Sequence, residues 1–177
     1  MHQTISLPCF ILAAGRGERM RPLTDSVPKP LLTIGNKSLL AWHLEALSKA
    51  DLKQVVINHA WLGEMIESAL GSGKQFNVAI TYSPEKTALE TAGGIVKALP
   101  LLAPLDYFLV INGDVFTPDL PLHNILETVS RLRNDPEKPF GDLYEIKCLP
   151  YEIFVNAATS DDVLVVPALT PAELQVR

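Results

Sequence analysis

A short apolar run leads directly into a basic loop that contains glycines near the start of this chain. Residues 9–14 read Cys-Phe-Ile-Leu-Ala-Ala, residues 15–21 read Gly-Arg-Gly-Glu-Arg-Met-Arg, and residues 28–30 read Pro-Lys-Pro. Glycines let backbone N–H groups approach phosphate oxygens closely. Arginine binds such oxygens bidentately, and lysine supplies a point charge. The order of a buried strand and a basic loop therefore predicts a polyphosphate site at the end of the strand.

Two common phosphate loops do not fit this run. A dinucleotide-binding fingerprint needs a third glycine where Met20 stands and a helix directly after the loop, which the prolines at 22, 28 and 30 oppose. A Walker loop needs Gly-Lys-Ser/Thr, which does not occur here. An ordinary charged surface loop is the remaining alternative. The recurrence of glycine, arginine and lysine behind one buried strand argues against it.

Short apolar runs alternate with helical patterns along most of the chain. Strands are predicted over 9–14, 54–58, 78–82 and 107–112, and helices over 39–48, 62–70, 91–99 and 122–132, with Pro100 expected to stop the third helix. After a loop or linker at 135–139, short strands are predicted over 143–150, 152–155 and 163–166, and residues 170–174 could start a helix. Such alternation predicts an α/β fold with a mostly parallel sheet between helices. Ligands bind these folds at the carboxyl ends of the strands.

Composition narrows the classes of function. The chain has 177 residues, enough for one domain with a real core, and a net charge of −5 gives no case for nucleic-acid or membrane binding. Its two cysteines make a disulfide framework improbable and favour a cytoplasmic location, and no signal peptide is expected. His43, on the expected polar side of a helix, and His59 lack the partners of a catalytic triad.

Two further segments carry chemistry. Asp114 ends the segment Asn-Gly-Asp after a predicted strand, where a carboxylate can hold Mg²⁺ against phosphate oxygens, although this triplet also favours a simple turn. Residues 89–94 read Leu-Glu-Thr-Ala-Gly-Gly and open a helix. Its glycines would let a flat base lie on the backbone, and an N-cap at residues 90–91 is an equally good reading.

The whole run from residue 12 to residue 31 resembles the signature of the sugar-nucleotide pyrophosphorylases, nucleotidyltransferases that join a nucleoside triphosphate to a sugar 1-phosphate. Their pattern, Leu-Ala-Ala-Gly-x-Gly-x-Arg-x-x-Pro-Leu-Thr and then Pro-Lys-Pro-Leu, is met at every position. The resemblance implies a Rossmann-like, three-layer α/β/α fold. It also implies a single nucleotidyltransferase domain over 1–177, with a nucleotide-binding core at 1–134 and a shortened sugar-binding part at 135–177.

The same resemblance implies roles for individual residues. Arg19 and Lys29 would be catalytic, Asn112 and Asp142 would contact the sugar phosphate, and Asp114 would hold Mg²⁺. The nucleotide would be bound by Leu12, Ala13, Ala14, Gly15, Gly17, Glu18, Arg19, Lys29, Leu89, Glu90 and Gly94.

Residues 57–63, 89–94 and 111–115 are similar to a subgroup that joins UTP to N-acetylmuramate 1-phosphate in cell-wall recycling. The expected reaction gives a UDP-sugar and pyrophosphate. A mannose 1-phosphate guanylyltransferase-like enzyme is the first alternative. An inactive nucleotide- or sugar-binding module and an incomplete gene product are the others, because the family's second metal aspartate, in Asp-Val-Gly-Thr-Pro, has no clear counterpart. Asp161 and Asp162 are speculative substitutes for it.

Overall fold

The computed structural model describes residues 7–102, 107–118, 120, 122–134, 143–148, 151–160 and 163–167. Its central seven-stranded sheet has the order β5-β4-β1-β6-β9-β8-β7. The strands of that sheet are β1 (Cys9–Leu12), β4 (Gln54–His59), β5 (Ala79–Pro84), β6 (Tyr107–Asn112), β7 (Leu143–Cys148), β8 (Tyr151–Ser160) and β9 (Val163–Pro167). A separate small hairpin joins β2 (Thr33–Ile34) to β3 (Lys37–Ser38).

The sheet has a parallel part and an antiparallel part. The pairs β5–β4, β4–β1 and β1–β6 are parallel, so the first four strands of the sheet stand in the spatial order third, second, first, fourth. The strands β9, β8 and β7 extend this core through antiparallel pairs. Right-handed crossovers through helices produce such a parallel core. The predicted α/β architecture is confirmed.

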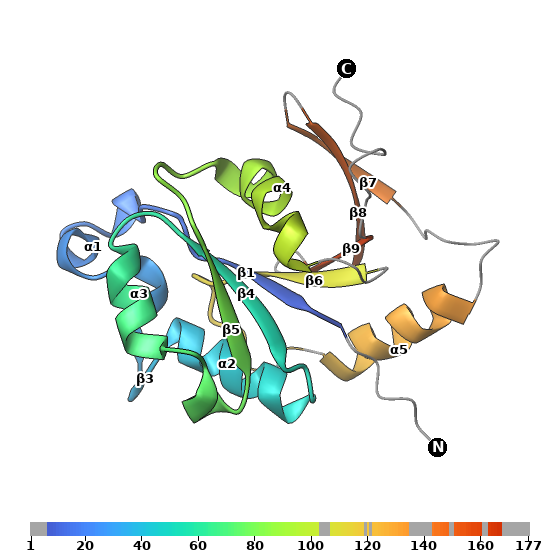
Figure 1. Cartoon of the computed structure of the whole chain (residues 1–177), viewed down its shortest axis with the longest axis horizontal. Helices are drawn as coiled ribbons and strands as arrows, with labels where there is room; N and C mark the ends of the chain where they lie inside the picture. The colour runs from blue at the N-terminus through green and yellow to red at the C-terminus, as the bar shows by residue number, and fades with distance from the viewer. Residues whose placement is uncertain are drawn as a thin grey trace.

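Helices cover both faces of the sheet (Figure 1). They are α1 (Leu23–Ser26), α2 (Leu39–Lys49), α3 (Gly63–Leu70), α4 (Glu90–Leu102) and α5 (Leu122–Asn134), with 3₁₀ turns η1 (Glu18–Met20), η2 (Lys29–Leu31) and η3 (Lys74–Phe76). Successive residues of a strand point to opposite faces. Accordingly, Cys9 and Ile11 pack with α2, α3 and α5, whereas Phe10 packs with α4.

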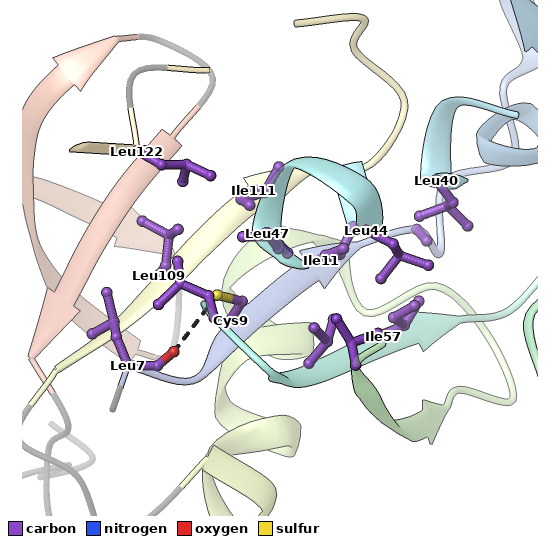
Figure 2. Close-up of a cluster of buried hydrophobic side chains, with 14 of the residues drawn as sticks. Leu7, Cys9, Ile11, Leu40, Leu44, Leu47, Ile57, Leu109, Ile111 and Leu122 are labelled. Carbon is purple, nitrogen blue, oxygen red and sulfur yellow. Dashed lines mark hydrogen bonds between the residues drawn. The ribbon is translucent and has the colours of Figure 1, made fainter. Parts of the chain in front are cut away.

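Figure 2 shows the larger of these two hydrophobic clusters, which fills the space between β1, β4, β6 and the helices α2 and α5. The Cys9 thiol donates a weak hydrogen bond to the carbonyl oxygen of Leu7, and burial raises the pKa of this thiol. Cys9 is therefore a small hydrophobic residue of the core. Among the described helices, none has the length and apolar character needed to cross a membrane.

Two local predictions are wrong. The helix α4 continues past Pro100 and ends at Leu102. Pro100 cannot donate a hydrogen bond to the carbonyl of residue 96 and crowds that carbonyl, a cost that burial of Leu102 in the core offsets. The prolines after the loop also admit one short helix, because α1 begins directly after Pro22. Proline is well tolerated at the start of a helix.

Strand register brings the loops of interest together. Ile11 of β1 pairs with Ile57 of β4, and Leu12 pairs with Asn112 of β6. The carboxyl ends of these three strands are therefore level. The loop that follows β1, the end of β4 and the turn after β6 all open onto the same edge of the sheet.

Candidate active site

A cavity of about 320 Å³ lies at this edge. It is lined by Leu12, Ala13, Ala14, Gly15, Arg16, Pro30, Asn58, Ala88, Glu90, Thr91, Asn112 and Asp114. These residues come from the carboxyl ends of β1, β4 and β6, from the η2 turn and from the start of α4. The sequence predicts a ligand-binding site at this edge of the sheet, and the cavity lies there.

The loop after β1 forms one wall of the cavity. Gly15 is exposed, and nothing lies within 4 Å of the position that a Cβ atom would take there. Gly17 has a φ of 67°, and a Cβ atom on it would stand 3.0 Å from the Cβ of Lys29. The hydroxyl of Thr24 donates to the carbonyl oxygen of Gly17 at 2.8 Å. The second glycine is thus required by backbone conformation and packing, whereas the first leaves the backbone open to a ligand.

Lys29 and Asp114 meet at the cavity although 85 positions separate them in sequence. Lys29 Nζ donates to Asp114 Oδ2 at 2.5 Å, and both side chains are partly exposed. Gly113 sets this distance, because its N–H donates to the carbonyl oxygen of Leu12 at 2.9 Å. A Cβ atom on Gly113 would lie 2.7 Å from Ile11 Cγ2. Only glycine lets the turn approach β1 closely enough to place Asp114 beside Lys29.

A buried polar network joins two walls of the cavity. Asn58, 1% exposed, accepts a hydrogen bond from the N–H of Ala13 at 2.7 Å and donates to Glu85 Oε1 at 2.8 Å. The other oxygen of Glu85 accepts from the N–H of Leu89 at 2.8 Å. A Cβ atom on Gly94 would stand 2.8 Å from Asn58 Nδ2. The network ties the loop after β1 to the segment that leads into α4, and Gly94 leaves room for it.

Arg16 is the arginine that lines the cavity. Its guanidinium carbon lies 3.2 Å from the centroid of the Trp61 ring, and its Nη2 lies 3.6 Å from Asp25 Oδ1. Arg19, by contrast, is exposed on η1 and is absent from the cavity lining. Its catalytic role stays a prediction.

The other predicted site residues divide into three groups. Leu12, Ala13, Ala14, Gly15, Glu90, Asn112 and Asp114 line the cavity. Gly17, Glu18, Lys29, Leu89 and Gly94 are not part of that lining, although Lys29 contacts the lining residue Asp114. Among them, Leu89 and Glu18 are exposed, and Glu18 lies 3.8 Å from Arg21. Asp142, Asp161, Asp162 and residues 170–174 lie outside the described residues.

Sequence reasoning did not select Arg16, Pro30, Asn58, Ala88 or Thr91 as site residues, and it missed Glu85 behind them. A signal existed for Asn58, a polar residue one position before the end of the apolar strand β4. Asn58 and Glu85 come from strand ends that pair side by side, since Asn58 pairs with Ser83. Topology, which the sequence alone leaves open, brings these two residues together.

The histidines also differ from expectation. His43 was expected on a polar helix face, but it is 2% exposed and its Nε2 lies 2.8 Å from the carbonyl oxygen of Val115. It fastens α2 to the segment after Asp114. His59 is buried as well, with its Nε2 2.7 Å from Glu67 Oε1. Both contacts join segments of the fold.

The residues present fit a divalent cation only in part. Asp114 offers one partly exposed carboxylate at the cavity, but the described part of the chain holds no group of three or more His, Cys, Asp or Glu side chains that could bind a metal ion. Mg²⁺ commonly takes one or two carboxylates and completes its octahedron with phosphate oxygens and water. Asp114 is suited to such a shared site.

Known proteins resemble this chain in sequence and in fold. A family model described as "Nucleotidyl transferase" matches residues 9–139. N-acetylmuramate alpha-1-phosphate uridylyltransferase of Neisseria meningitidis serogroup B is 51% identical over 148 residues, which cover 77% of this chain and 63% of that protein. Mannose-1-phosphate guanylyltransferase catalytic subunit beta of Xenopus tropicalis is 38% identical over 122 residues, which cover 68% of this chain and 34% of that protein.

The alignments thus span less than two thirds of the length of either relative. Among solved structures, HddC from Yersinia pseudotuberculosis complexed with GMP-PN matches with a TM-score of 0.62 and 20% identity. That match covers 92% of this chain and 74% of HddC. At this identity it supports the fold alone.

Proposed function

Because this chain belongs to the nucleotidyl transferase family, we propose that it joins UTP to N-acetylmuramate 1-phosphate and releases pyrophosphate. The choice of substrates is supported by the 51% identical Neisseria protein, which is named for that activity. The contact between Lys29 and Asp114 at the cavity is the observation that carries the proposal. It sets a cation and a carboxylate beside a glycine-containing loop, as a polyphosphate with its counter-ion requires.

In the proposed reaction, an oxygen of the sugar 1-phosphate attacks the α-phosphorus of UTP. A new P–O bond forms, the bond from the α-phosphorus to the bridging oxygen breaks, and its electron pair leaves with pyrophosphate. The attacking oxygen is already anionic, so no base has to remove a proton. Catalysis then rests on positioning and on neutralisation of charge.

In this reaction Lys29 would bind the reacting phosphates. Its ammonium group lies 2.5 Å from Asp114 and is therefore held at the edge of the cavity. From there its charge would bridge the α-phosphate and the sugar phosphate. Pro28 and Pro30 limit the backbone on either side of Lys29, which lowers the entropy lost in holding the side chain.

Asp114 would hold Mg²⁺ together with phosphate oxygens, and Asn112 and Asp142 would contact the sugar phosphate. The bound ion would supply positive charge that offsets the charge on the phosphates. Asn112 lines the cavity next to Asp114, which supports its assignment. Arg19 would contact the β- and γ-phosphates from η1. The exposed position of Arg19 means that this contact requires its side chain to turn toward the cavity.

We further propose that the chain acts in the cytoplasm, in peptidoglycan recycling. Nucleoside triphosphates are available there, and the buried thiol of Cys9 is compatible with a reducing compartment.

A guanylyltransferase that acts on mannose 1-phosphate is the second candidate, because several relatives of that description are 37–39% identical to this chain. Thermal unfolding with UTP or GTP, each with Mg²⁺, tests the base. Stabilisation follows RT ln(1 + [L]/Kd), so a tenfold preference appears as roughly 1.4 kcal/mol at saturation. We expect UTP to stabilise more. A larger effect of GTP would favour the second candidate.

Release of pyrophosphate, measured with each pair of nucleotide and sugar phosphate, separates an enzyme from a binding module. Binding together with release supports the proposed reaction. Binding without release identifies an inactive nucleotide-binding protein. A chain that binds neither nucleotide contradicts the proposal.

A further inference from the structure

Arg16 occupies an unusual position in the wall of the cavity. It follows Gly15 in the loop after β1, and its side chain is 29% exposed. Its Nη1 atom is buried and has no hydrogen-bond partner among the described residues. A buried cationic N–H group without an acceptor costs free energy, because it has lost water and gained nothing in return. An acceptor supplied by a ligand in the cavity would remove that cost.

Asp25 does not fill this role. Its Oδ1 lies 3.6 Å from Arg16 Nη2, which is too long for a hydrogen bond, and it lies closer, at 3.3 Å, to Nε of Arg21. Asp25 is also half exposed, so water screens its charge. Arg16 is therefore held near a carboxylate but is not saturated by it.

Trp61 holds the guanidinium in place. The guanidinium carbon of Arg16 lies 3.2 Å from the centroid of the Trp61 ring. The indole N–H of Trp61 donates to the carbonyl oxygen of Thr24 at 3.1 Å. That hydrogen bond fixes the ring to α1. An arginine stacked on an aromatic face keeps the N–H groups at its edge available for a planar acceptor. The stack thus orders the guanidinium before any ligand arrives.

We propose that Arg16 is a second phosphate-binding arginine of this site, which contacts the β- and γ-phosphates of the nucleotide, and that Trp61 is the platform that positions it. The identity of the ligand rests on the proposed function. A phosphate oxygen would satisfy the buried Nη1 atom of Arg16 and would compete readily with the loose contact to Asp25. Arg16 lines the cavity in this structure without a change of conformation, which distinguishes it from Arg19.

Calorimetric binding of inorganic pyrophosphate, UTP and uridine to the full chain tests this proposal. Arg16→Ala should weaken pyrophosphate and UTP binding roughly 10- to 100-fold, the range expected for a charge-assisted hydrogen bond. Uridine binding should stay unchanged, because uridine has no phosphate. Arg16→Lys should be intermediate, since it keeps the charge and loses the planar fork. Lys49→Ala is the matched control, because Lys49 is exposed on α2 and outside the cavity lining.

A double-mutant cycle tests the platform. Trp61→Leu should weaken pyrophosphate binding roughly 2- to 5-fold in the chain that keeps Arg16, as expected for loss of a cation–π contact. It should have no effect in the Arg16→Ala background. Equal effects of Trp61→Leu in both backgrounds would show that Trp61 does not act through Arg16.

The outcomes separate this inference from the proposed function. If Arg16→Ala binds pyrophosphate as tightly as the unaltered chain, the inference is wrong. The inference is also wrong if Arg16→Ala weakens the binding of uridine and of UTP by the same factor, because Arg16 would then act on the shape of the whole site. A chain that binds pyrophosphate through Arg16 but does not bind UTP would contradict the proposed function and would still support Arg16 as a phosphate-binding residue. A chain that binds none of these ligands would overturn both.

Discussion

Asn58→Ala would show how much of the site depends on the buried network behind it. In the folded chain, the Asn58 side chain accepts a hydrogen bond from the N–H of Ala13 and donates one to an oxygen of Glu85. Glu85 is 6% exposed and also holds the N–H of Leu89. Removing the amide leaves one backbone donor and one carboxylate oxygen without their partner in a region that excludes most water.

The expected loss of stability follows from those two groups. A buried donor or acceptor that loses its partner costs about 1–3 kcal/mol, and a charged group costs more. Two such groups predict a fall of roughly 2–6 kcal/mol in the free energy of unfolding. The same substitution frees the loop after β1 from the segment before α4, so nucleotide affinity should fall as well.

Urea unfolding measures the free energy of unfolding, and calorimetric titration with UTP measures nucleotide affinity. Leu47→Ala is the control, because Leu47 is fully buried in α2 and does not line the cavity. It should lose a comparable 2–5 kcal/mol of stability, a typical range for such a substitution. Measured at a temperature where both variants are folded, only Asn58→Ala should bind UTP more weakly. Equal affinity of the two variants would refute the idea that the network organises the site.

Three further perturbations test individual groups. Lys29→Ala should lower turnover by about 10²-fold or more, with only partial recovery in Lys29→Arg, and unchanged steady-state turnover would refute its role. Asp114→Asn should abolish the Mg²⁺ dependence of turnover and leave the circular dichroism spectrum unchanged, and a variant with full Mg²⁺ stimulation would show that the metal binds elsewhere. Burial, and then the charge of Glu67, raise the pKa of Tyr82 from 10.0 to about 12. Because the folded-state pKa is the higher one, this contribution to stability is complete below about pH 10 and is lost as the pH rises toward 12. Tyr82→Phe should flatten the fall in stability over that range, and parallel curves for the two proteins would exclude this cause.

The sequence predicts correctly those features that the residues of a single segment determine. The apolar runs that form β1, β4 and β6 are buried on both faces, and such strands are easy to recognise. The nearness of the loop after β1 and the turn that carries Asp114 was also predictable, since both follow strands whose carboxyl ends share one edge.

The remaining features depend on contacts between distant segments. Glu85 follows β5 in the sequence, and its role becomes visible only when β5 pairs with β4 and sets it beside Asn58. The sequence placed Arg16 in the basic loop but gave it no role of its own, because its orientation depends on Trp61, 45 positions later. Residues 135–142, which include the predicted sugar contact Asp142, lie outside the described residues, so that prediction stays untested.

The fate of the α-phosphate of UTP shows whether this chain forms a sugar nucleotide. The purified chain would be incubated with Mg²⁺, UTP labelled at the α-phosphate and N-acetylmuramate 1-phosphate, and the products resolved by chromatography and mass spectrometry. The account predicts that the α-label moves into UDP-N-acetylmuramate, that one pyrophosphate is released for each sugar nucleotide formed, and that GTP with mannose 1-phosphate gives far less product. Label that remains in UTP, or appears only in UMP through hydrolysis, would contradict it.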